Sequence, residues 1–185
     1  MQSAGVCKAR GKKRKLKDSK SDEWRTGKEI FKWLNDIYHF VADVAADHHN
    51  HLCEKYITKQ QNALYVNWYD CFCTAAKIEW VFLNCPFSNI EDWLKKAAIE
   101  MNKGLGVVML LPYTGQLYWK ELVVEKATKI YMIYGRLPYL HPETGMPHKK
   151  CNFPSAIVIF DPSGKGAYPA EFTEWISQDV WMKRF

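Results

Sequence analysis

The feature that most constrains this chain is an apolar run that ends abruptly in polar residues. Residues 80–83 (WVFL) lead directly into Asn84-Cys85-Pro86-Phe87, and a second apolar run follows at residues 107–111. Continuous apolar runs are typical of strands buried on both faces of a parallel sheet, and open α/β sheets bind ligands at the carboxyl ends of such strands. The sequence therefore predicts an α/β protein with its functional site at Asn84.

The four residues after the first run suit the binding of an amine on a planar ring. The side-chain carbonyl of Asn84 can accept a hydrogen bond from an exocyclic amine, and the peptide carbonyl of Cys85 can accept the amine's other proton. Phe87 offers a face on which a planar ring can stack, and Pro86 stiffens the turn. We therefore predict Asn84, Cys85, Pro86 and Phe87 as the catalytic group.

The rest of the chain alternates helical and strand patterns. Apolar residues at helical spacing predict a helix that begins at Thr26 or Gly27 and runs through Ile37, a helix over residues 90–103 that ends at Gly104, and a third near residues 116–125. Further strands are expected over residues 40–45, 129–134 and 156–160. This alternation predicts a mostly parallel sheet with helices on both faces.

Charge separates the chain into two parts. Residues 1–20 hold eight basic side chains and one acidic one, whereas the remainder holds 18 basic and 19 acidic residues. We therefore expect a basic disordered arm over residues 1–21 and a single domain over residues 22–185. The arm suits nonspecific phosphate contacts with nucleic acid, through Lys12, Lys13, Arg14 and Lys15, and its alternative role is that of a solubilising tail.

Other sequence features exclude several classes. No run of 18 apolar residues is present, so we expect no membrane association and a cytoplasmic protein. The six cysteines lack Cys-x2-Cys spacing, so we expect reduced thiols and no disulfide. The cluster of His48, His49, His51 and Cys53 lacks the spacing of a zinc site, and we expect no metal.

An ordered set of short motifs extends over residues 22–162 and resembles the phage-type DNA N-6-adenine methyltransferase family. The central motif, Asn84-Cys85-Pro86-Phe87, is similar to the Asp/Asn-Pro-Pro-Tyr/Phe motif of the S-adenosylmethionine-dependent amino methyltransferases. The other matching segments are Glu23-Trp24-x-Thr26, Asp43-Val44-Ala45-Ala46-Asp47, Asn50, Cys53, Tyr56-Ile57-Thr58, Asn62-Ala63-Leu64, Trp68 and Phe153-Pro154-Ser155-Ala156. The order of the set is more specific than any single member.

The resemblance implies a Rossmann-like methyltransferase fold and S-adenosylmethionine as cofactor. Thr26 would hold the methionine carboxylate near a helix N-terminus, and Asp43 would meet the cofactor's ammonium group or its ordered water. Ala45 stands where a small side chain permits close approach, and Asn62 stands where a polar residue would bind the cofactor's adenine. The alternatives are a helix N-cap for Asp43 and a surface turn for Asn62.

The implied substrate is adenine in double-stranded DNA, methylated at N6 at specific sites after extrusion from the duplex. The long polar loop over residues 135–152 would contact DNA through Arg136, Lys149 and Lys150. The resemblance also implies that the protein comes from a phage, acts in the host cytoplasm and belongs to restriction-modification. We expect a monomer or weak dimer.

Two departures from the family pattern keep rival functions open. Gly27 and Cys85 each replace a proline, so both the cofactor turn and the catalytic turn lose a rigid ring. One rival is a catalytically impaired protein that binds DNA or the cofactor as a decoy or regulator. The other is a methyltransferase that acts on another amine, such as cytosine N4.

Overall fold

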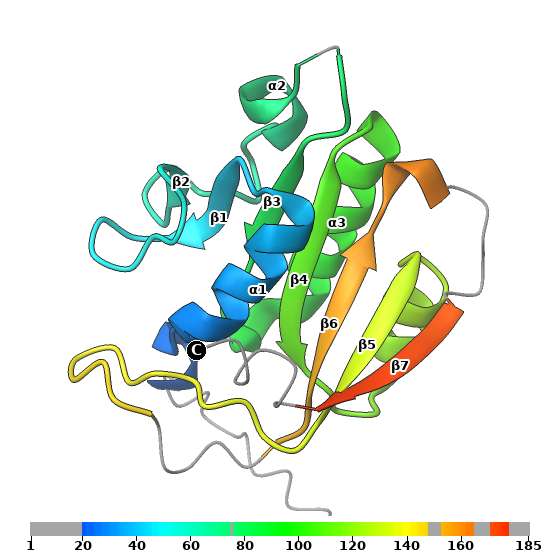
Figure 1. Ribbon diagram of the computed structural model, residues 1–185. Coiled ribbons are helices and arrows are strands. Elements are labelled where there is room, and N and C mark those ends of the chain that lie inside the picture. The colour runs from blue at the N-terminus through cyan, green and yellow to red at the C-terminus, as the bar shows by residue number, and fades with distance from the viewer. Residues whose placement is uncertain (1–19, 75, 148–152, 165–170, 178–185) are drawn as a thin grey trace, which may run out of the picture.

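The protein is an α/β structure built on one seven-stranded sheet (Figure 1). The computed structural model describes residues 20–74, 76–147, 153–164 and 171–177. The helices are α1 (Lys28–Tyr38), α2 (Trp68–Phe72) and α3 (Ile90–Lys103), with short 3-10 turns η1 (Lys20–Glu23), η2 (Phe87–Asn89) and η4 (Pro162–Gly164) and a π-helix, η3 (Trp119–Val124). The strands are β1 (Ala42–Ala46), β2 (Lys55–Thr58), β3 (Trp80–Leu83), β4 (Gly106–Pro112), β5 (Lys129–Tyr134), β6 (Ser155–Phe160) and β7 (Glu171–Ser177).

Helices cover both faces of the sheet, as the alternating pattern predicts. Ile30 and Leu34 of α1 pack on one face in a core cluster that includes Val108 and Leu110 of β4. Leu94 of α3, like Ala97 and Met101, is fully buried against the other face. The neighbouring residues of β4 alternate between the two clusters, so this strand forms the middle of both cores.

The prediction of a mostly parallel sheet is wrong, because the sheet is mixed. The strand order is β2-β1-β3-β4-β6-β5-β7, and β6 runs antiparallel to both of its neighbours, β4 and β5. A parallel pair needs a crossover connection, usually a helix, whereas antiparallel neighbours do not. The segment between β5 and β6 carried no helical pattern, and that absence is the physical reason for the reversal.

The chain reverses its direction of travel across the sheet at β1. It passes from β1 to β2 on one side and then returns to β3 on the other side of β1, with all three strands parallel. The crevice outside the carboxyl ends of two strands at such a switch point is where open α/β sheets bind ligands. The ends of β1 and β3 therefore define the functional edge of this sheet.

The register of β3 against β4 is fixed by a close approach of Trp80 to Gly106. These residues are paired across the two strands, and a Cβ atom added at Gly106 would lie 2.4 Å from the Trp80 ring. Only glycine leaves room for the indole here. This contact sets the level at which β3 ends and hence the position of Asn84.

Candidate active site

Asn84 lies at the carboxyl end of β3, and its amide has a defined orientation. The side-chain Nδ2 donates a hydrogen bond to the backbone carbonyl of Trp24 at 3.1 Å. The other amide atom, Oδ1, is buried and has no hydrogen-bond partner in the part of the chain that the structure describes. A buried acceptor without a donor is costly, and in native structures it signals a functional role or a missing ligand.

The position of Asn84 at a strand end does not leave its side chain exposed. Asn84 is half-buried because residues 22–27, which we call the N-terminal strap, lie across it. Asp22 of the strap accepts a hydrogen bond from the Ser88 N–H at 2.9 Å. Arg25 exchanges two backbone hydrogen bonds with Leu140, at 3.0 and 2.8 Å. The strap is therefore joined to the loop after β5 and to residues 84–88, which hold the predicted catalytic group and which we call the catalytic turn.

Four aromatic rings surround the catalytic turn. Trp24 stacks on Phe153 with ring centroids 5.5 Å apart and an interplanar angle of 11°. Phe87 meets both Phe153 and Tyr139 edge to face, each at 5.7 Å. The rings come from the strap, the catalytic turn, the loop after β5 and the segment before β6, so they close the site from segments distant in sequence.

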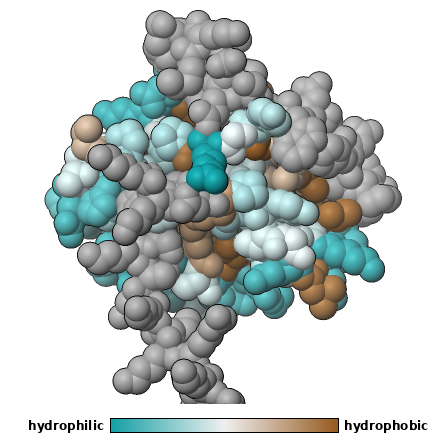
Figure 2. Space-filling view, turned by 90° about the horizontal axis from the view of Figure 1, so that it is seen from below, coloured by the Kyte–Doolittle hydropathy of each residue, from teal (hydrophilic) through white to brown (hydrophobic). Residues whose placement is uncertain are grey.

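A wide pocket of about 560 Å³ opens beside the catalytic turn. Phe87 and Phe153 supply aromatic walls, and Pro112 at the end of β4 lies on the far side. The polar groups that line it include Thr114 and Gln116 and two acidic residues, Glu91 and Asp92, and among the described residues no lysine or arginine lines it. Figure 2 looks onto this edge of the sheet, where apolar side chains show between polar ones. With acidic and aromatic residues in its lining, the pocket suits a flat ring without negative charge better than a phosphate.

Tyr113, which follows the end of β4, does not line this pocket. Its ring instead packs edge to face on Trp119, with centroids 4.9 Å apart.

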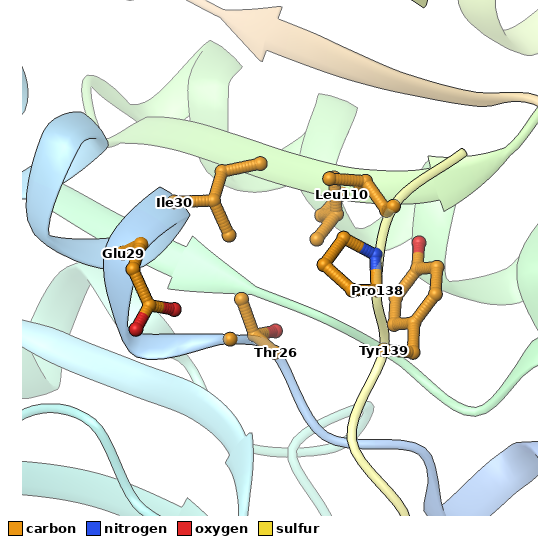
Figure 3. A pocket seen from close by; sticks show the side chains of 8 residues that line it. Thr26, Glu29, Ile30, Leu110, Pro138 and Tyr139 are labelled. Atoms are coloured by element: carbon orange, nitrogen blue, oxygen red, sulfur yellow. The ribbon is translucent and has the colours of Figure 1, made fainter. Parts of the chain in front are cut away.

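Thr26 lies at the N-terminus of α1, where a small pocket opens (Figure 3). It is 5% exposed, and its Oγ1 is buried without a hydrogen-bond partner among the described residues. Gly27 is the N-cap of α1 and supplies no side-chain cap. The N–H groups of the first helical turn and the Thr26 hydroxyl are donors that suit an anion, although the carboxylate of Glu29 lines the same pocket.

Asp43 lies within β1 and is 4% exposed. One carboxylate oxygen accepts from the Ala45 N–H at 3.3 Å, and the other accepts from the Leu52 N–H at 3.2 Å. Burial raises the pKa of Asp43 to about 6, although these two hydrogen bonds and nearby His51 lower it in part. Asp43 is therefore not a helix N-cap, and each of its oxygens retains a lone pair for a ligand.

The other two residues expected at the cofactor lie apart from Thr26 in different settings. Ala45 is half-buried in β1 and its side chain packs on the α3-side core. Asn62 is exposed in the turn after β2, with a φ of 56° in the left-handed region. Asparagine tolerates that conformation well, which explains its presence in the turn.

The histidine cluster is engaged with one tyrosine rather than converging on a point. His48 Nδ1 lies 2.8 Å from the Tyr56 hydroxyl, and His51 stacks on the Tyr56 ring at 4.2 Å. His51 Nδ1 also hydrogen-bonds the carbonyl of Cys53. Within the described ranges, no group of three or more His, Cys, Asp or Glu side chains is placed to hold a metal ion.

The remaining predicted residues fall in two groups. Cys85 is 3% exposed, and burial raises the pKa of its thiol far above the usual range, so the thiol stays protonated. Pro86 precedes η2 with extended backbone, and Arg136 is exposed just after β5. The DNA contacts predicted at Lys12, Lys13, Arg14, Lys15, Lys149 and Lys150 lie outside the described residues.

Asp22, Trp24 and Tyr139 belong to the site but were not predicted as site residues. Trp24 was visible in the Glu23-Trp24-x-Thr26 motif, which signalled that the strap matters. Tyr139 lay in a segment that its composition marked as a polar loop, yet it is 1% exposed. Only its bulk among prolines and charges signalled a buried role.

An unpaired amide oxygen at a switch-point strand end, beside aromatic rings and a pocket with acidic residues in its lining, makes this edge of the α/β sheet a candidate binding site for a planar amine. The family model described as DNA N-6-adenine-methyltransferase (Dam) matches residues 13–178. The chain belongs to this family of enzymes, which methylate adenine in DNA.

Two relatives are similar over most of this chain. A DNA N-6-adenine-methyltransferase of Haemophilus phage HP1 (strain HP1c1) is 29% identical over 171 residues, which cover 89% of this chain and 92% of the relative. One of Escherichia phage T1 is 28% identical over 158 residues, or 77% of this chain and 63% of the relative. No solved structure matches the chain. None of the described helices has the length and apolar character that crossing a membrane requires.

Proposed function

We propose that this chain transfers a methyl group from S-adenosylmethionine to the N6 amine of an adenine extruded from double-stranded DNA. The observation that carries the proposal is the buried, unpartnered Oδ1 of Asn84 at the carboxyl end of β3. An acceptor of this kind is complementary to an N–H of the target amine. A hydrogen bond from that N–H to Oδ1 draws the nitrogen toward tetrahedral geometry and makes its lone pair available. The lone pair would form the new N–C bond as the bond between the methyl group and the cofactor's sulfur breaks, and the amine would then release one proton to solvent.

The base would enter the pocket beside Phe87. Extrusion costs a few kcal/mol, and stacking on the aromatic walls formed by Phe87 and Phe153 offsets that cost. The peptide carbonyl of Cys85 is the proposed second acceptor, with Pro86 holding the turn. Positioning and electrostatic preorganisation supply the catalysis, with no covalent intermediate and no metal.

The cofactor's methionine group fits the donors at the start of α1. The unpartnered Thr26 hydroxyl and the first-turn N–H groups would hold its carboxylate, and the remaining lone pairs of Asp43 would accept from its ammonium group. The small side chain of Ala45 would let the cofactor approach the backbone of β1 closely. Asn62 is the proposed hydrogen-bond partner of the cofactor's adenine. When bound, S-adenosylmethionine supplies a methyl group on a positively charged sulfur.

The sheet itself is proposed to be a compact Rossmann-like methyltransferase sheet, in which β6 is the antiparallel member. The switch point at β1 and β3 supports this assignment, because Asp43, a proposed cofactor ligand, lies in β1, and Asn84, the proposed ligand of the target amine, follows β3. DNA would be held by Arg136, Lys149 and Lys150 and by the basic arm at residues 12–15, with the protein acting as a monomer or weak dimer in the cytoplasm of the phage's host.

The test is transfer of labelled methyl from S-adenosylmethionine to unmethylated duplex DNA, followed by nucleoside analysis. The proposal expects label in N6-methyladenine alone. Label in N4-methylcytosine would overturn the choice of base, and cofactor binding with no label in DNA would favour a binding protein instead.

A further inference from the structure

We infer that Asp22 is a positioning residue for methyl transfer, acting through the strap on the amide of Asn84. The inference rests on the proposed function, since it assigns how that site is kept in register. Asp22 accepts from the Ser88 N–H at 2.9 Å, across 66 positions of sequence. Two residues further along the strap, the Trp24 carbonyl accepts from Asn84 Nδ2 at 3.1 Å.

The orientation of the Asn84 amide decides whether the site can function. A primary amide presents an acceptor on one side and two donors on the other. If the amide turned over, its N–H groups would face the N–H groups of the target amine, and the site would repel its substrate. The Trp24 carbonyl prevents this, because it pairs with Nδ2 and leaves Oδ1 directed elsewhere.

The Trp24 carbonyl must therefore be held at a fixed place relative to the catalytic turn. Stacking of Trp24 on Phe153 and the backbone bridge between Arg25 and Leu140 attach the strap to the loop after β5 and to the start of β6. The stacking contact reaches the turn from Asn84 to Ser88 indirectly, because the Phe153 ring meets Phe87 edge to face. The bonds of Asp22 to Ser88 and of Trp24 to Asn84 join the strap to the turn directly, at two points.

Two attachments fix both the separation and the rotation of two segments, whereas one leaves a hinge. Without the Asp22 bond, the strap would be able to rotate about the hydrogen bond between Trp24 and Asn84, since its ring contacts reach the turn through Phe153 and Tyr139. The Ser88 N–H stands in the first turn of η2, where the N-cap residue Pro86 supplies no side-chain hydrogen bond.

The test compares Asp22→Ala with Asp22→Asn, and with Asp36→Ala on the exposed surface of α1 as a control for charge. In Asp22→Ala, kcat should fall about 10- to 100-fold, since a misplacement of about 1 Å can cost about 100-fold. Cofactor affinity and Tm should stay near those of the wild type. In Asp22→Asn the amide oxygen accepts the same bond, so most of kcat should return. Asp36→Ala should match the wild type.

A double-mutant cycle shows whether Asp22 acts through Asn84. In the Asn84→Ala background, Asp22→Ala should leave the residual rate unchanged, because the oriented group is already absent. If Asp22→Ala is unfolded at the assay temperature, Asp22→Ser, whose side chain is shorter, replaces it with the same expectation.

Three results would overturn the inference: a kcat of Asp22→Ala equal to that of the wild type, an equal loss in Asp22→Asn, or a further loss in the Asn84→Ala background. Absence of methyl transfer by the wild-type protein in the same assay would instead refute the proposed function. The two failures are therefore distinguishable.

Discussion

Asp43 gives the sharpest prediction from physical chemistry, because burial raises the pKa of its carboxyl to about 6, well above the usual value of an aspartate. A folded-state pKa above the unfolded value means that the native state binds more protons between these two pH values. The free energy of unfolding therefore falls as pH rises through this window. A shift of about 2 units corresponds to about 3 kcal/mol.

The same titration should control cofactor binding. Ionised Asp43 accepts much more strongly from the cofactor's ammonium group than the protonated form does, and the ionised fraction with a pKa of about 6 rises about tenfold between pH 5 and pH 7. Calorimetric titration of the wild-type protein with S-adenosylmethionine should therefore show affinity increasing about tenfold over this range. Asp43→Asn should bind weakly at both pH values and lose the dependence.

The comparison with Asp43→Asn separates Asp43 from its charged neighbours. His51 and Asp47 also act on this carboxyl, His51 lowering its pKa and Asp47 raising it. The difference in unfolding free energy between Asp43→Asn and the wild type should grow by about 3 kcal/mol from pH 4 to pH 7. A difference that does not change with pH, or equal pH dependence of cofactor affinity in both proteins, would refute the reasoning.

Two further predictions concern stability and DNA binding. Glu100 is fully buried, and its carboxylate accepts hydrogen bonds from Lys96 at 2.7 Å and from Lys103 at 2.9 Å. Burial alone would raise the pKa of Glu100, but these two bonds and a third from the Tyr69 N–H lower it below its usual value. Its stabilisation is therefore present above its unfolded pKa and lost as pH falls through the folded pKa. Urea unfolding of Glu100→Gln should show a free energy of unfolding lower than that of the wild type by about 3 kcal/mol at pH 7 and by less at pH 3. The exposed control Glu121→Gln should match the wild type. A loss of stability that does not depend on pH would contradict this prediction. Removing residues 1–19 should weaken DNA binding, measured by fluorescence anisotropy, and should reduce the dependence of DNA affinity on salt concentration. The affinity for the cofactor should not change. An unchanged salt dependence would show that the arm does not contact DNA.

The sequence predicted the long amphipathic elements well. The helix over residues 90–103 begins and ends where the pattern places it, because its apolar stripe is regular and Gly104, with φ 116°, ends it. The short elements β2, α2 and β7 were missed. β2 has four residues and α2 has five, too few for a period to be visible.

The direction of β6 and the surroundings of Asn84 show what sequence patterns leave out. A strand pattern is the same in either direction, so β6 was recognised but its antiparallel pairing was not. Asn84 was identified from its place after an apolar run, whereas its bond to Trp24 joins residues 60 positions apart. Such contacts depend on the complete fold and have no local signature.

The most direct test of the central claim is methyl transfer to duplex DNA by Asn84→Ala, with cofactor binding measured on the same sample. The truncation removes one acceptor and one hydrogen bond to Trp24, so we expect a cost of about 1 kcal/mol in folding and near wild-type affinity for S-adenosylmethionine. Loss of a preorganised group of this kind costs a factor of about 10² to 10³ in rate, so incorporation of labelled methyl should nearly vanish. Turnover at the wild-type rate, or a loss of cofactor binding as large as the loss of turnover, would contradict the assignment of Asn84 to the target amine.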